Sequence, residues 1–103
     1  MEAAVKIVPS IEYRLSEIRS DWARRGYTFE YWIDQPGQAW RNFIHEVDEL
    51  VILIEGEIEL EFGGKQVRPA VGEEITILAR TAHTVVNTGD TSNRWCFGYR
   101  SKK

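Results

Sequence analysis

The hydrophobic pattern of this chain changes its period once, near Gly26. Before that point, apolar residues recur at helical spacing, at Ile11, Leu15, Ile18 and Trp22. Such positions share one face of a helix. Ser10 is a suitable N-cap, and Gly26 is a suitable stop after the last turn. The pattern therefore predicts one amphipathic helix over residues 11–25.

Beyond Gly26, short apolar runs alternate with polar residues and end at turn signals such as Gln35-Pro36-Gly37 and Gly63-Gly64. Alternation with a period of two is typical of strands. We expect seven or eight strands, at residues 27–33, 40–47, 50–54, 57–62, 65–68, 75–78, 84–86 and 95–99. Many short strands with closely spaced turns predict a small antiparallel sandwich or barrel. The helix is then an N-terminal extension (1–26) of an all-β domain (27–103), in one folded unit.

The segment 50–54 is apolar at every position. A strand with one face in water alternates, so both faces of this strand must be covered. Either the predicted helix packs on the outer face, or a second copy of the chain does. Of these two, the sequence interpretation favours a homodimer.

Composition and charge exclude several classes of function. Thirteen basic residues against 16 acidic ones give a net charge of -3, without the basic clusters that bind nucleic acid. We find no signal peptide and no apolar run long enough to span a membrane. The single cysteine, Cys96, cannot form an intrachain disulfide. Together these features favour a cytoplasmic protein.

The candidate chemistry lies at the only two histidines, His45 and His83. In a regular strand His45 and Glu49 point to the same face, and His83 comes from a distant strand. If the barrel brings them together, two imidazoles and a carboxylate make a three-ligand site for a divalent metal. The same set occurs at non-haem iron sites and at catalytic zinc sites with a bound water.

The spacing of residues in two segments of the chain then matches the two motifs of a known family. The run from Gly37 through His45 and Glu49 to Gly56 resembles the first cupin motif, G-x5-H-x-H-x3-E-x6-G. The run from Gly72 through His83 to Asn87 resembles the second, G-x5-P-x-G-x2-H-x3-N. The resemblance implies a jelly-roll barrel, the double-stranded β-helix, with a small-molecule ligand inside.

Carried over position by position, the resemblance implies His45, Glu49 and His83 as metal ligands. The first histidine position of motif one holds Phe43, which cannot ligate, and Leu78 and Arg80 replace the usual proline and glycine of motif two. The metal can be Fe, Mn, Ni or Zn. Two alternatives stay open: Asp48 replaces the missing ligand through a strand bulge, or the three residues form a metal-free polar cluster.

Aromatic residues on the expected strands are candidates for the pocket wall, namely Tyr31, Trp40, Phe43 and Tyr99. Such walls suit a small organic molecule, although the sequence favours burial in an ordinary core as the role of these residues. The sequence leaves three functions open: a metal-dependent enzyme whose reaction it does not define, a non-catalytic binding or sensing module, and a structural dimer with a degenerate site.

Overall fold

The computed structural model describes residues 10–101. Its one α-helix, α1, spans Ile11–Arg24. The Ser10 side chain accepts a hydrogen bond from the backbone N–H of Tyr13, as an N-cap does. Gly26 takes a left-handed φ of 88°, which favours glycine and lets the chain turn away from the helix. The helix predicted from the sequence is confirmed to within one residue.

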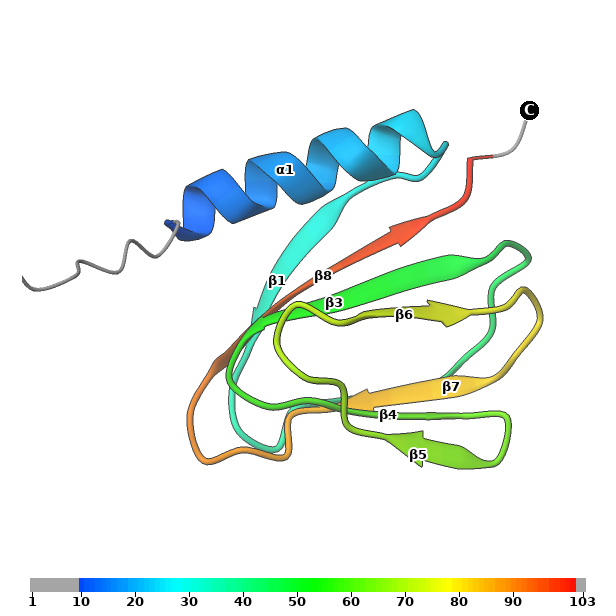
Figure 1. The fold of residues 1–103 in the computed structure, drawn as a ribbon. Coiled ribbons are helices and arrows are strands. Elements are labelled where there is room, and N and C mark those ends of the chain that lie inside the picture. Colours follow the sequence, from blue (N-terminus) through cyan, green and yellow to red (C-terminus); the bar gives the residue numbers. More distant parts are fainter. Residues whose placement is uncertain (1–9, 102–103) are drawn as a thin grey trace, which may run out of the picture.

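Eight strands follow the helix and form two antiparallel four-stranded sheets. The strands are β1 (Glu30–Asp34), β2 (Ala39–Phe43), β3 (Glu49–Glu55), β4 (Glu59–Phe62), β5 (Lys65–Val67), β6 (Glu74–Ile77), β7 (His83–Val86) and β8 (Asn93–Tyr99). One sheet has the order β1-β8-β3-β6 and the other β2-β7-β4-β5, and the two face each other (Figure 1). The predicted antiparallel jelly roll with an N-terminal helix is confirmed. No helix within 10–101 is long and apolar enough to cross a membrane.

Four of the expected strands are shorter than their sequence patterns, and two of them, at 27–33 and 40–47, lose three residues or more at one end. The first begins at Glu30 rather than at residue 27, and only Tyr27 adds an isolated bridge with Arg100. The second ends at Phe43, and its register with β7 shifts between Trp40 and Phe43. The segment 44–48 is therefore a loop, and it carries His45 out of the ladder.

The core consists of two clusters on opposite faces of the β1-β8-β3-β6 sheet. Val51 and Leu53 of β3 point between the sheets, towards Trp95 and Leu60. Leu50, Ile52 and Ile54 point the other way and pack with Trp22 of the helix. The helix thus covers the second apolar face of β3, so this face does not require a second copy of the chain. The homodimer stays a prediction.

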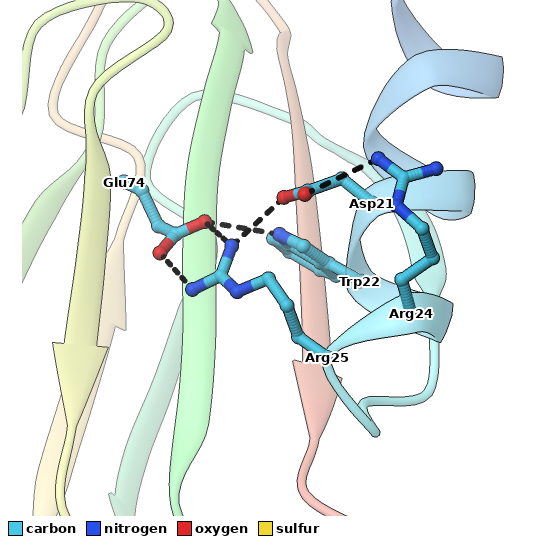
Figure 2. A network of polar contacts seen from close by, with 5 residues as sticks. All are labelled: Asp21, Trp22, Arg24, Arg25 and Glu74. Atoms are coloured by element: carbon cyan, nitrogen blue, oxygen red, sulfur yellow. Dashed lines mark hydrogen bonds and ion pairs between the residues drawn. The ribbon is translucent and has the colours of Figure 1, made fainter.

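Polar contacts at the end of α1 attach the helix to the sheet (Figure 2). Glu74 of β6 accepts hydrogen bonds from the Trp22 indole N–H at 3.1 Å and from both terminal nitrogens of Arg25 at 2.9 and 2.7 Å. Trp22 itself is fully buried, and a Cβ on Gly98 would collide with the Trp22 ring and the Thr28 carbonyl. The absence of a side chain at Gly98 therefore lets the helix approach the sheet.

Candidate metal centre

The fold brings together the two histidines and the glutamate that the sequence pattern singled out. Glu49 opens β3, His83 opens β7, and His45 lies in the loop after β2. One ligand atom from each of the three lies within 4.8 Å of the others. Glu49 Oε1 is 3.1 Å from His83 Nε2 and 3.8 Å from His45 Nε2. Residues 38 positions apart in the chain thus meet between the two sheets.

The protonation of His83 is fixed by its neighbours. Its Nδ1 lies 3.1 Å from the Thr81 carbonyl oxygen, which can only accept a hydrogen bond, so Nδ1 carries a proton. In the neutral ring, Nε2 then directs its lone pair towards Glu49. Burial lowers the pKa of His83, but the Glu49 carboxylate and the Thr81 carbonyl raise it by more, and the net pKa lies above its ordinary value. The position facing Glu49 thus favours a positive charge.

His45 is more accessible than the other two residues and is held by its loop. Its backbone carbonyl accepts a hydrogen bond of 2.7 Å from the N–H of Arg80, a residue with a left-handed φ of 62°. Its Nε2 lies 3.2 Å from the Tyr99 hydroxyl, and the Phe43 ring stacks on its imidazole with an interplanar angle of 8°. Burial, more than the charges of Glu49 and Glu30, raises the pKa of Tyr99 to about 12, so this hydroxyl stays protonated at neutral pH.

Asp48 does not join the cluster. Its side chain accepts a hydrogen bond of 2.8 Å from the backbone N–H of Ala79, and its carbonyl accepts one of 2.9 Å from Arg100. The alternative in which a bulge turns Asp48 into a replacement ligand is therefore not realised. The bulge of β2 lies earlier in the chain, between Trp40 and Phe43.

A cavity of about 260 Å³ opens beside the cluster, between the two sheets. Aromatic side chains form most of its wall, namely Trp32, Trp40, Phe43, Trp95, Phe97 and Tyr99. His45, Glu49 and His83 form its polar end. Of the four aromatic residues expected at a pocket wall, Trp40, Phe43 and Tyr99 line this cavity.

Tyr31 does not line the cavity, contrary to the expectation. It pairs with Cys96 across β1 and β8, and both side chains face the helix. Side chains of a strand alternate between faces, so the neighbouring Trp32, which pairs with Trp95, is the residue that faces the cavity. The inner face of β1 therefore carries Trp32 and not Tyr31, which is the reverse of what the sequence pattern suggested.

Asp34 is a further residue that the sequence analysis missed. It is buried, and its Oδ2 accepts hydrogen bonds of 3.0 Å from the indole N–H groups of both Trp40 and Trp95. A carboxylate directly before the turn at 35–37 resembles a solvated turn residue. A signal was nevertheless present, because Asp34 shares an inner face with Trp32 by strand alternation.

The donor atoms at the polar end fit a divalent transition metal. Glu49 Oε1 is completely buried and receives no hydrogen bond of regular geometry, and the ring nitrogens of His83 and His45 lie 3.1 and 3.8 Å from it. Buried carboxylates are normally paired, hydrogen-bonded or bound to a metal. Here the carboxylate faces two imidazole nitrogens, and His83 has the backbone carbonyl partner that orients metal-ligating histidines. A cation placed among these atoms would satisfy all three.

Comparison with known families and structures agrees with this geometry. The family model described as "Cupin domain" matches residues 30–99, which hold all three candidate ligands and the cavity wall. No curated protein matches the chain significantly.

Several solved structures share the fold. A protein from Photorhabdus luminescens is 19% identical, with a TM-score of 0.68 over 75% of this chain and 64% of its own. The Cupin_2 domain of an XRE family transcriptional regulator from Enterobacter cloacae is 18% identical, with a TM-score of 0.69 over 80% and 90%. A predicted oxalate decarboxylase from Thermotoga maritima is 20% identical, with a TM-score of 0.68 over 82% and 74%. At such identities the likeness shows the fold alone.

Proposed function

This chain belongs to the cupin domain family, and from that premise we propose that it binds one divalent transition metal ion, with a small organic molecule beside it. The ligands are His45 Nε2, Glu49 Oε1 and His83 Nε2, and Fe, Mn, Ni and Zn all accept such a set. The observation that carries the proposal is the buried Glu49 oxygen, which faces two imidazole nitrogens at one end of a cavity and receives no hydrogen bond of regular geometry.

Each residue of the site has a distinct role. The Thr81 carbonyl holds the proton of His83 on Nδ1 and keeps Nε2 free to ligate. Arg80 fixes the His45 loop, and the aromatic wall keeps water away from the polar end. A metal with three protein ligands supplies Lewis acidity and open coordination positions for a ligand.

A binding or sensing module without turnover is the second candidate function. The titratable side chains that line the cavity are the three proposed ligands and Tyr99, whose pKa of about 12 makes it a weak base and a weak acid at neutral pH. No other cavity residue is suited to general acid–base catalysis. This favours binding over a reaction that needs a proton shuttle. Chemical change of a bound molecule in the presence of metal would contradict it.

The test compares Glu49→Gln with Glu46→Gln. Both changes replace a carboxylate by an amide of the same shape, but Glu46 is exposed and pairs with Arg80 outside the cluster. We expect about one zinc or manganese ion per wild-type chain, a higher melting temperature with metal present, and the same for Glu46→Gln. Glu49→Gln should lose metal and its thermal stabilisation. Equal metal content in the two variants would contradict the proposal.

A further inference from the structure

The wall of the cavity restricts the chemistry of the molecule that it holds. None of the lysine and arginine side chains that the structure describes lines the cavity. Trp40 and Trp95 each have a single N–H donor, and both donors are already bonded to Asp34. The wall therefore presents mainly carbon. Its polar groups are the Trp32 indole N–H and, at the His45–Glu49–His83 end, the three candidate ligands and the Tyr99 hydroxyl.

The orientation of the rings gives a ligand both faces and edges to contact. Trp32 and Trp40 meet at an interplanar angle of 88° with centroids 5.1 Å apart, and Phe97 lies at 35° to Trp95. Aromatic rings carry negative faces and positive edges, so another aromatic ring finds stacked and edge-to-face partners here. An aliphatic ring of the same size finds dispersion contacts only.

The size of the cavity sets the number of rings. A cavity of about 150 Å³ holds benzene. The space here is about 260 Å³, which accommodates one substituted ring or two small fused rings. It is small beside most ligand pockets, which occupy roughly 300–1,000 Å³.

The charges at the polar end disfavour two other kinds of ligand, quaternary ammonium cations and small dianions. Quaternary ammonium groups also bind between aromatic faces. In this cavity, however, such a cation would adjoin the metal ion, and the two positive charges would repel each other. A small dianion has the opposite problem, because no basic side chain would balance its second charge.

We propose that the cavity binds a small uncharged aromatic molecule that carries a hydroxyl oxygen directed at His45, Glu49 and His83. The part of this inference that places a metal ion beside the ligand rests on the proposed function. The preference of the cavity for an aromatic ring over a saturated ring does not. In the metal-free chain the hydroxyl meets the same three side chains, of which the His45 imidazole is the most accessible.

Calorimetry with four probes tests this inference on metal-free and zinc-treated protein: catechol, trans-cyclohexane-1,2-diol, tetramethylammonium and oxalate. The diol carries the same two oxygens as catechol on a saturated ring. We expect catechol to bind at least about tenfold more tightly than the diol in both forms. If the diol, tetramethylammonium or oxalate binds as tightly as catechol, the inference is wrong.

Variants locate the binding. Trp32 and Phe43 line the cavity but are 38% and 41% exposed, so replacing either one by leucine should leave the fold intact. We expect Trp32→Leu and Phe43→Leu each to weaken catechol binding about fivefold or more. Tyr13→Leu, which removes an exposed aromatic ring on the helix, should not change it. Equal effects of the three substitutions would overturn the inference.

The zinc content of the same samples separates the two claims. Zinc binding without a preference for catechol would overturn the aromatic inference and leave the proposed function standing. A preference for catechol in a chain that takes up no zinc would support the aromatic inference and contradict the metal site.

Discussion

At the residue scale, the two histidines and Glu49 could be singled out from the sequence by motif spacing, although His45 lies in a loop and does not share a strand with Glu49 as alternation had suggested. The sequence could not show which atoms face each other. Their orientation depends on the Thr81 carbonyl, on the left-handed Arg80 and on the Tyr99 hydroxyl, which are tertiary contacts. Asp34 escaped prediction for the same reason, since its indole partners come from β2 and β8.

Removal of the Asp34 carboxylate should destabilise the protein strongly. Asp34→Ala leaves the buried indole N–H of Trp95 and the partly buried one of Trp40 without an acceptor, and we expect a loss of about 2–4 kcal/mol in the free energy of unfolding. Urea unfolding followed by tryptophan fluorescence measures the change. Asp90→Ala, at an exposed position, is the control and should alter stability by less than about 0.5 kcal/mol. Similar losses in both variants would show that Asp34 does not stabilise the indoles.

At the element scale, the helix was predictable because its cap, its apolar face and its glycine stop are all local in sequence. Strand ends were less predictable, since the end of β2 depends on a register shift against β7. The attachment of α1 through Glu74 could not be anticipated, because Glu74 lies 49 residues from Arg25. The apolar run 50–54 of β3 did predict that the outer face of this strand is covered, and the structure shows that the helix provides this cover.

The attachment of the helix should weaken in acid. Hydrogen bonds from Arg25 lower the pKa of Glu74 below its ordinary value and outweigh the effect of burial. A carboxylate whose pKa is lowered by folding stabilises the protein above its unfolded pKa. This stability is lost as the pH falls through the folded pKa. We therefore expect Glu74→Gln to cost about 1 kcal/mol at neutral pH.

The difference between wild type and Glu74→Gln should disappear at a pH below the folded pKa of Glu74. Denaturant unfolding of both proteins between about pH 3 and pH 7, which spans the titration of a glutamate with a lowered pKa, measures this difference. Glu73→Gln, one residue earlier on an exposed position, is the matched control. A difference that stays constant or grows as the pH falls would contradict the assignment.

At the scale of the whole molecule, motif spacing indicated the barrel and a site inside it. It did not indicate the shape of the cavity, because the choice of inner face on β1 depends on the pairing of Trp32 with Trp95. The helix and the barrel share the cluster around Trp22, and we infer from this that the described residues 10–26 and 27–101 fold as one unit. The cavity, with its aromatic wall and its polar end, lies between the two sheets of this unit.

Anomalous diffraction at the zinc edge, from crystals grown with zinc, tests the central claim most directly. The metal site predicts one strong peak per chain, at about 2.0–2.2 Å from His45 Nε2, Glu49 Oε1 and His83 Nε2. Peaks confined to surface residues, with these three side chains in contact only with one another and with water, would contradict it.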